Sequence, residues 1–191
     1  AVEDAVRRGA NVIFTTTPKL LLSSVRQAAL HPDVKILNCS LNTSYPSVRT
    51  YYPRLYGAKF IKGAIAGTLT RDGCIGYVAD YPTYGSIASI NAFAQGARMV
   101  NANARIYLDW AHLRDGGAVG RLQAQGIVYI DYLDRLAAST GTQMGNRHNL
   151  ALIQTHWGRL YQSLVRRVME GSWKQEDQGS SAVNYWWGME Q

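Results

Sequence analysis

The sequence predicts an α/β protein whose strands form parallel sheets, and three observations lead to this prediction. Short apolar runs rich in β-branched residues, such as 11–16 and 34–39, are typical of strands that are buried on both faces of a parallel sheet. Amphipathic helical segments alternate with these runs, and the links between them are short. Residues 51–110 contain the clearest strand–helix–strand unit, and such units place a ligand crevice beyond the carboxyl ends of their strands.

The first part of the chain has the order helix, strand, helix, strand. An opening helix ends at Gly9, since glycine readily adopts the conformation that stops a helix. A strand follows at 11–16. Proline in the first turn then starts a helix over 18–30, whose apolar residues share one face. A second strand at 34–39 completes the unit.

The middle of the chain repeats this order after a break. We expect residues 42–52, which are polar and contain proline, to form a loop that crosses between two lobes. A helix at 53–71 leads to a strand at Cys74–Ala79. A second helix at 85–100 then leads to a strand at 105–110.

The long helix at 53–71 has an apolar face that runs through Ile61, Ile65 and Leu69, which we expect to be its buried side. The same helix contains glycines, among them Gly63. Because glycine lowers helix propensity, its presence predicts a close backbone approach to a neighbouring element.

Beyond the strand at 105–110 the pattern is weaker. Residues 112–120 are polar and rich in glycine, and 133–148 also have the composition of a loop. Short apolar runs at 127–130 and 150–153 predict two more strands. Leucine and valine recur at helical spacing over 157–170, which predicts an amphipathic helix.

Composition and charge fit a globular protein and indicate no special class of partner. The 191 residues carry a net charge of +7, but no run of basic residues is longer than two, so we expect no nucleic-acid partner. The chain has no stretch of about 18 apolar residues, so the sequence predicts no membrane span. The histidines lack the spacing of a metal site, so we expect neither a metal nor a cofactor. Cys39 and Cys74 lie in strand patterns, where free thiols are common, and a disulfide between them stays open.

Several segments match a known family in the right order. A helix rich in glycine and alanine leads into a glycine-containing strand, an NAF-x-x-GA helix and a strand that ends in tryptophan. A segment of the form W-G-x-x-Y…G-x-W and a WWG tail come later. The chain therefore resembles the Bmp family of substrate-binding lipoproteins, the basic membrane proteins of bacterial ABC transporters. The segments that carry this resemblance are 58–70, Cys74–Ala79, 91–97, 106–110, 155–174 and 186–188.

The resemblance implies a type I periplasmic-binding-protein architecture, in which two Rossmann-like lobes with parallel sheets close on a ligand about a hinge. Lobe one would hold residues 1–44 and 154–191, and lobe two would hold 45–153, with crossovers near 41–52 and 149–157. We expect the family's first strand to be lacking, since the match begins inside the family's second strand–helix unit.

Two positions depart from the pattern of the family's nucleoside binders. Those proteins carry an aspartate at the end of the second strand seen here, and this chain has Ser40 in its place. A lysine expected near the start of the last helix is also missing, and Gln154, Thr155 and His156 occupy its neighbourhood. The departures bear on specificity for nucleosides more than on the fold.

Ligands of open parallel sheets meet the loops that follow the strands. Here these loops hold hydroxyl groups, an amide, carboxylates and aromatic rings, which suit a sugar hydroxyl and a stacked base. The expected ligand-binding residues are Thr16, Thr17, Asn38, Ser40, Asp80, Tyr81, Asp109 and Trp110. Simpler roles stay open for several of them: helix capping for the threonines, a turn before Pro82, and core packing for the tryptophan.

The function that the resemblance implies is capture of a small hydrophilic solute, foremost a nucleoside or else a sugar-like molecule, for delivery to an ABC permease. Such a protein would be extracytoplasmic, either periplasmic or anchored as a lipoprotein. The alternative is a ligand-sensing domain of a regulatory protein, which would be cytoplasmic, because one fold serves several functions. We do not expect an enzyme, although Asp80 and Asp109 could form a carboxylate pair of the kind that some glycosidases use.

Overall fold

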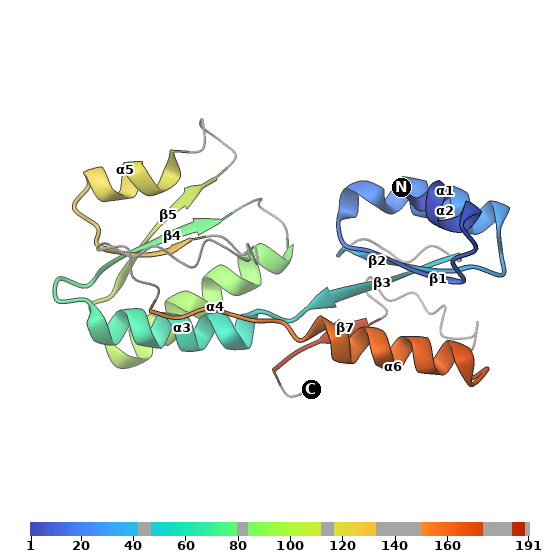
Figure 1. Ribbon diagram of the computed structural model, residues 1–191. Coiled ribbons are helices and arrows are strands. Elements are labelled where there is room, and N and C mark those ends of the chain that lie inside the picture. Colours follow the sequence, from blue (N-terminus) through green and yellow to red (C-terminus); the bar gives the residue numbers. More distant parts are fainter. Residues whose placement is uncertain (42–46, 80–83, 112–116, 133–149, 174–184, 190–191) are drawn as a thin grey trace. The chain divides into compact units, whose positions relative to one another are not determined.

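A computed structural model of the chain shows two compact units (Figure 1). Unit 1 comprises Ala1–Arg54 and Thr155–Gln191, and unit 2 comprises Leu55–Gln154. The two lobes expected from the sequence, 1–44 with 154–191 and 45–153, stay a prediction. The residues that the structure describes are 1–41, 47–79, 84–111, 117–132, 150–173 and 185–189.

Unit 1 is built on one parallel sheet with helices on both faces. Its elements are α1 (Val2–Arg7), β1 (Val12–Thr15), the 3-10 turn η1 (Pro18–Leu20), α2 (Leu21–Leu30), β2 (Lys35–Cys39), β3 (Val48–Pro53), α6 (Trp157–Met169) and β7 (Tyr185–Trp187). The strand order is β1-β2-β3-β7, and all neighbours are parallel. Helices α1 and α2 cover one face and α6 covers the other (Figure 1). The expected α/β class with parallel sheets is confirmed.

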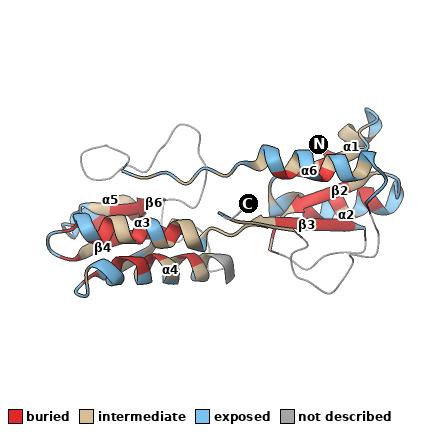
Figure 2. Ribbon diagram, turned by 90° about the horizontal axis from the view of Figure 1, so that it is seen from below, coloured by how far each residue is buried: buried red, intermediate tan, exposed pale blue. Residues whose placement is uncertain are grey.

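Successive side chains of these strands point to opposite faces of the sheet. Three apolar residues paired in register, Ile13, Ile36 and Val48, pack in the cluster beneath α1 and α2. On the other face Leu37 and Tyr51 pack against α6. Strands β2 and β3 are accordingly mostly buried (Figure 2). Cover on both faces is what continuous apolar runs in parallel strands require.

Strand β3 occupies part of the loop expected from the sequence. The prediction of a polar loop over 42–52 is wrong from Val48 onward, where a strand pairs with β2 on one side and β7 on the other. Arg49 and Thr50 made this segment look polar, yet both are buried. The Arg49 guanidinium lies 4.0 Å from the centroid of the Trp173 ring, and such a cation–π contact helps to hold a charge inside the unit.

Unit 2 has a three-stranded parallel sheet in the order β5-β4-β6. Its elements are α3 (Tyr56–Leu69), β4 (Cys74–Ala79), α4 (Tyr84–Val100), β5 (Arg105–Trp110), α5 (Ala118–Ala124) and β6 (Tyr129–Tyr132). Helices α3 and α4 lie on one face of this sheet, and α5 lies on the other (Figure 1). The strand–helix–strand unit expected across this region is confirmed.

Helices α3 and α4 touch through their backbones. A Cβ atom added at Gly63 would lie 2.0 Å from the carbonyl oxygen of Phe93, and one at Gly96 would lie 1.9 Å from that of Phe60. These distances are far shorter than any real contact of a Cβ atom, so only glycine fits. The predicted close approach of the glycines in this helix is confirmed, and the partner is α4.

The buried side of α3 differs from the expected one. Small residues and a lysine form the buried side, whereas Ile61 and Leu69 are 47 % and 39 % exposed. The close contact with α4 explains the difference, since two helices can touch along their backbones only where their side chains are small. The rotation of this helix was therefore predicted wrongly. The buried residues of α3 are Lys59, Gly63, Ala66 and Gly67.

Three other details bear on the predictions. Helix α5 covers part of the region expected to be irregular, and it buries Ala118 and Leu122. The prediction of a strand at 150–153 is wrong: residues 150–156 have no regular secondary structure. Cys39 and Cys74 are free thiols, so the structure shows no disulfide between them. The loop expected at 133–148 lies outside the described residues.

Candidate functional site

Unit 1 carries a row of polar side chains across three strands, at the end of β1 and next to the end of β2. Thr15, Asn38 and Thr50 occupy neighbouring register positions on β1, β2 and β3, two residues beyond the apolar row beneath α2. Thr15 is 4 % exposed, and the other two are fully buried. Burial of an amide or hydroxyl costs free energy unless the group is hydrogen-bonded, so the bonding of this row decides what it can do.

A chain of hydrogen bonds fixes the orientation of the Asn38 amide. The Thr15 hydroxyl donates to the carbonyl oxygen of Leu37 at 3.1 Å, so its oxygen accepts from Nδ2 of Asn38 at 2.6 Å. Nδ2 also donates to the carbonyl oxygen of Thr17 at 3.0 Å. Both amide protons are thus used inside the protein, and Oδ1 of Asn38 remains as an acceptor.

Two buried polar atoms at this edge have no hydrogen-bond partner. They are Oδ1 of Asn38 and Oγ of Ser40, the residue that follows β2. Ser40 is 1 % exposed, and its backbone N–H donates to the carbonyl oxygen of Tyr51 at 3.2 Å. An unsatisfied buried polar group costs about 1–3 kcal/mol. Asn38 is the last residue but one of β2, and Ser40 follows the strand directly. Ligands of α/β sheets bind near the carboxyl ends of the strands, so these two residues are the best candidates for ligand contacts among the described residues of unit 1.

The two threonines before α2 differ in their surroundings. Thr17 accepts a hydrogen bond at Oγ1 from the backbone N–H of Lys19 at 3.4 Å, so it caps η1, which is the simpler role left open from the sequence. The side chain of Thr16 is exposed. A ligand contact of either residue stays a prediction.

An aromatic cluster that the sequence analysis did not single out lies on the α6 face of this sheet. The hydroxyl groups of Tyr51 and Tyr161 are 3.0 Å apart, and Tyr51 also donates to the carbonyl oxygen of Thr15 at 3.2 Å. The Trp157 ring stacks on that of Tyr161 with 6.1 Å between centroids and an angle of 11°. The spacing of four residues in a predicted helix was the available signal. The strand that carries Tyr51 was not predicted, because its segment has the composition of a loop.

The groups at this edge are uncharged at neutral pH. Burial raises the pKa of both Tyr51 and Tyr161, and so both remain phenols. Burial also raises the pKa of the Cys39 thiol to about 11. The other polar side chains described above for this edge are the hydroxyls of Thr15, Thr50 and Ser40 and the amide of Asn38. These neutral groups suit a neutral ligand.

In unit 2 the carboxylate of Asp109, which we expected to contact a ligand, is already ion-paired. Arg121 of α5 donates to Asp109 through Nε at 2.8 Å and through Nη2 at 2.9 Å, which is a bidentate, charge-assisted pair. The neighbouring Trp110 packs, partly buried, against the core cluster on the face covered by α3 and α4. The structure thus shows core packing for the tryptophan. Ligand binding by Asp109 or Trp110 stays a prediction.

Asp131 of β6 is a buried carboxylate that the sequence analysis missed. Lys59 of α3 pairs with its Oδ2 atom, and Lys62, one turn further along α3, pairs with Oδ1. Lys59 Nζ also lies 5.0 Å from the centroid of the Tyr77 ring. Burial acts to raise the pKa of Asp131, but the two ammonium groups outweigh this effect and hold the pKa below its usual value. The cluster is an internally ion-paired core of unit 2.

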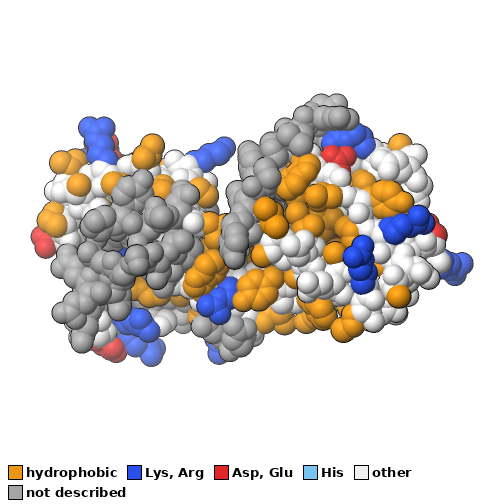
Figure 3. Space-filling model, turned by 180° about the vertical axis from the view of Figure 1, so that it is seen from behind, with side chains coloured by type: hydrophobic (Ala, Val, Ile, Leu, Met, Phe, Trp, Pro, Cys, Tyr) orange, Lys and Arg blue, Asp and Glu red, His pale blue; other side chains and the backbone are white. Residues whose placement is uncertain are grey.

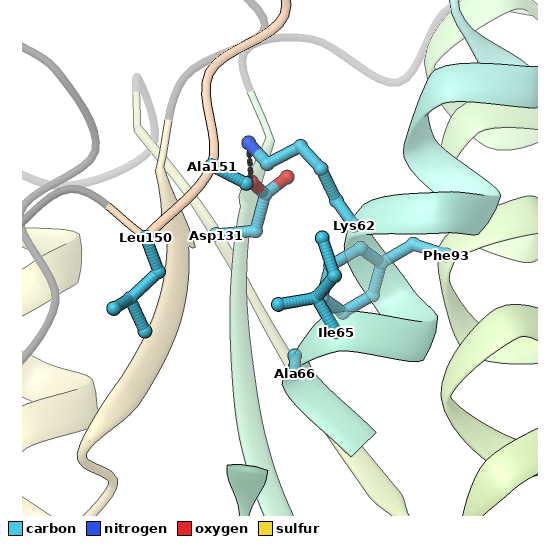
Figure 4. Close-up of a pocket in the computed structure, with 7 residues that line it drawn as sticks. All are labelled: Lys62, Ile65, Ala66, Phe93, Asp131, Leu150 and Ala151. Carbon is cyan, nitrogen blue, oxygen red and sulfur yellow. Dashed lines mark ion pairs between the residues drawn. The ribbon is translucent and has the colours of Figure 1, made fainter. Parts of the chain in front are cut away.

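A small cavity adjoins this ion pair. Figure 4 shows Lys62 and Asp131 pointing toward each other from α3 and β6 at its polar side. The volume is about 10 Å³, which is space for about one water molecule, so neither a nucleoside nor a sugar fits. The other lining residues are apolar: Ile65, Ala66, Phe93, Leu150 and Ala151.

The remaining expected site residues, Asp80 and Tyr81, lie outside the described part of the chain, so their role stays a prediction. Within that part, no three His, Cys, Asp or Glu side chains gather as the ligands of a metal ion would. None of its helices is long and apolar enough to cross a membrane. On the face drawn in Figure 3, lysine and arginine side chains lie in several separate places.

Comparison with known families and proteins gives a consistent picture. The family model for Bmp, described as PnrA-like ABC transporter substrate-binding proteins, matches residues 1–141. A purine-binding protein of Brucella abortus is 24 % identical over 212 aligned residues, which cover all of this chain and 59 % of that protein. A putative ABC transporter glucose-binding protein of Haloferax volcanii is 26 % identical, over 94 % of this chain and 50 % of that protein. The chain thus spans between half and three-fifths of the length of these relatives.

Solved structures agree on the fold. An ABC transporter solute-binding protein from Conexibacter woesei superposes with a TM-score of 0.64 at 15 % identity, covering 91 % of this chain and 66 % of that one. A transcriptional activator of the comK gene from Bacillus halodurans gives a TM-score of 0.66 at 16 % identity, with coverages of 98 % and 70 %. At these identities the likeness shows the fold alone, and the two proteins differ in function.

Proposed function

The chain belongs to the Bmp family of PnrA-like ABC transporter substrate-binding proteins, and on this premise we propose that it captures a small hydrophilic solute for an ABC importer. We propose further that it works outside the cytoplasm, either free in the periplasm or anchored as a lipoprotein. Its partners would then be the solute and the permease that receives it. In this role it would bind without chemical turnover.

The observation that carries the proposal is the polar edge of unit 1. Three parallel strands each contribute a buried polar residue there, and Asn38 and Ser40, two residues further along the chain, keep unsatisfied atoms. A core that only needed stability would favour apolar residues in these places, since each unsatisfied atom costs about 1–3 kcal/mol. A bound solute that supplies the missing hydrogen bonds would recover this free energy.

We propose a purine nucleoside or purine base as the ligand class. The relative from Brucella abortus is described as purine-binding, which supports this choice. The edge of unit 1 is neutral and offers hydrogen-bonding groups, as a purine or a ribose requires. The relative described as glucose-binding makes a hexose the next candidate.

A thermal-shift screen of the purified protein tests this function. The ligands are adenine, adenosine, guanosine, glucose and an amino acid as a negative control. A ligand at about 100 times its Kd adds about 2.7 kcal/mol, which is a shift of roughly 5–10 °C for a chain of this length. A shift with purines supports the proposal. A shift with glucose alone moves the ligand class, and no shift with any solute contradicts the binding function.

A ligand-sensing regulatory domain is the second candidate, because the chain superposes on a transcriptional activator as well as on a solute-binding protein. The two roles differ in the partner. Co-purification with a permease in detergent, dependent on the bound solute, supports the transport role. A solute-dependent change in transcription, with no association with a permease, supports the regulatory role.

A further inference from the structure

We infer that the outer face of helices α3 and α4 binds a second copy of this chain, so that two copies associate about a two-fold axis through unit 2. The outer face consists of side chains that are exposed on the two helices: Ile61, Thr68, Ile87, Asn91, Gln95 and Met99. The inference is independent of the proposed solute binding, because it concerns the side of these helices that is turned away from the sheet.

The first step of the argument concerns the charged residues of the two helices. A surface helix ordinarily carries charged side chains on its exposed side, and a helix that is apolar all round is normally buried. The charged residues of α3 are Lys59 and Lys62, and both pair with Asp131 of β6. The one charged residue of α4 is Arg98, in its last turn, where its Nε donates to the carbonyl oxygen of Ala104 at 3.5 Å. Charge is therefore confined to the buried side of α3 and to the end of α4.

The second step concerns the apolar side chains of the outer face. Ile61 is 47 % exposed, Ile87 is 49 % exposed and Met99 is 64 % exposed. Ile87, Gln95 and Met99 are separated by multiples of four residues, so they share one side of α4. Large apolar side chains gathered on an exposed surface mark an interaction site. The exposed side of α6 in unit 1 instead carries positive charge, from Arg159, Arg166 and Arg167.

The third step identifies the occupant of the outer face as a second copy. In an association about a two-fold axis, a surface meets the same surface of its partner. A charged face would meet its own sign there, and it would add to the repulsion between two chains of net charge +7. The polar groups of the outer face are different, because the amides of Asn91 and Gln95 each hold both donors and an acceptor and so can bond to an amide of the other copy. The face is thus complementary to itself, and it offers no counter-charge to a charged partner.

The size of the outer face sets the expected strength of the association. Helices α3 and α4 lie on the same face of the sheet (Figure 1), and they contain 14 and 17 residues. At about 1.5 Å per residue and about 10 Å in width, the pair presents a surface of roughly 20 Å by 20–25 Å, so two copies cover roughly 1,000 Å² in projection. Interfaces of about this area belong to weak and transient complexes, so we expect a Kd on the order of 10–100 µM.

Sedimentation velocity of the purified protein tests the association. Between about 5 µM and about 500 µM the parent should pass from monomer to dimer, as the expected Kd requires. Raising the salt concentration to about 0.5 M should leave the association unchanged or strengthen it, because salt screens the repulsion between the two positive chains. A parent that stays monomeric at every concentration would overturn the inference. A dimer that salt dissociates would contradict an uncharged interface.

The decisive variants are Ile61→Lys and Ile61→Glu, each of which puts a charge into the centre of an apolar contact. Each variant alone should dimerise at least about 10-fold more weakly than the parent, because a charge that loses water without a counter-charge is costly. A mixture of the two variants should associate more tightly than either alone, since opposite charges then occupy the interface. Equal association of the parent and Ile61→Lys would show that another surface joins the copies, and it would overturn the inference.

Leu22→Lys is the matched control. It makes the same change of charge at a leucine of α2 in unit 1 that is 76 % exposed, so this variant should dimerise as the parent does. Far-UV circular dichroism checks that each variant keeps the fold. The thermal shift with a solute should be the same for Ile61→Lys and the parent, which separates this inference from the proposed function. A monomeric parent that binds a permease through Ile61 would assign the outer face to the permease and overturn the inference.

Discussion

Both units place polar residues toward the carboxyl ends of parallel strands, but they satisfy them in opposite ways. In unit 1 the residues are neutral, and Asn38 and Ser40 are left with unsatisfied atoms. In unit 2 the residues are carboxylates, and cations of the same unit pair with them: Arg121 with Asp109, and two lysines with Asp131. The difference separates groups that can serve recognition from groups that are occupied by internal pairing.

Fold class alone therefore says little about where a ligand binds. Each sheet is parallel and has helices on both faces. Among the described residues of unit 1, Asn38 and Ser40 keep neutral polar atoms without a partner, whereas in unit 2 Oδ1 of Asp131 is ion-paired with Lys62. A polar residue at a strand end is a candidate for ligand binding only when it keeps a hydrogen-bonding atom that no group of the protein satisfies. Perturbing each kind of group shows how far this distinction holds.

Loss of the Asp131 carboxylate should have the largest effect. The Asp131→Asn variant leaves two buried or nearly buried lysines without their counter-charge, and breaking such a pair costs about 3–5 kcal/mol. Urea unfolding followed by circular dichroism measures the loss. The control is Asp4→Asn, which removes exposed pairs with Arg7 and Arg8 and should change stability by less than about 1 kcal/mol. Equal effects would show that burial does not distinguish the pairs.

Acid should weaken the same cluster gradually. The lysines hold the folded pKa of Asp131 below its unfolded value, so the stabilisation is fully present above the unfolded pKa of about 3.9. It is lost as the pH falls from there through the folded pKa. Urea midpoints between pH 6 and pH 3 should therefore fall more for the parent than for Asp131→Asn. Parallel pH profiles would contradict this assignment.

Disruption of the backbone contact between α3 and α4 should cause the next largest loss of stability. Gly63→Ala forces a Cβ atom to within 2.0 Å of the Phe93 carbonyl oxygen unless the helices separate, and overpacking of this kind costs about 1–3 kcal/mol. Gly120→Ala in α5 is the control, because a Cβ atom there meets nothing within 4 Å. That change should stabilise the protein by up to about 1 kcal/mol, since alanine is the better helix former. Thermal unfolding distinguishes the two signs.

The smallest of these effects belongs to unit 1. Tyr51→Phe removes the bond to the Thr15 carbonyl oxygen and the contact with the Tyr161 hydroxyl, and loss of such bonds costs about 0.5–1.5 kcal/mol. The aromatic packing is kept. A loss comparable to that of Asp131→Asn would mean that the neutral edge is as tightly coupled to the fold as the ionic core. The measurement is again the urea midpoint.

The sequence predicted the alternation of strands and helices well, because apolar runs and helical periodicity are local signals. It failed where a long-range partner decides the structure. Arg49 is polar as a residue, but its guanidinium lies over the Trp173 ring, which comes more than a hundred residues later. The rotation of α3 was likewise decided by its contact with α4.

The candidate site was predictable in part for the same reason. Asn38 and Ser40 could be placed at a strand end by counting, whereas the amide orientation depends on bonds to Thr15 and Thr17 from another part of the unit. Asp131 could not be recognised as an internal charge, since its partners on α3 are some seventy residues earlier. Spacing within one element shows which residues share a face, but it does not show which other element packs against that face.

The split composition of unit 1 has a consequence for synthesis on the ribosome. Strands β1 to β3 are made first, but α6 and β7, which cover and extend their sheet, are translated only after all of unit 2. At 5–20 residues per second this interval lasts roughly 5–20 s. During that time Leu37 and Tyr51 lack the helix that buries them. The nascent chain therefore exposes an apolar sheet face, and a chaperone that shields it should raise the yield of folded protein.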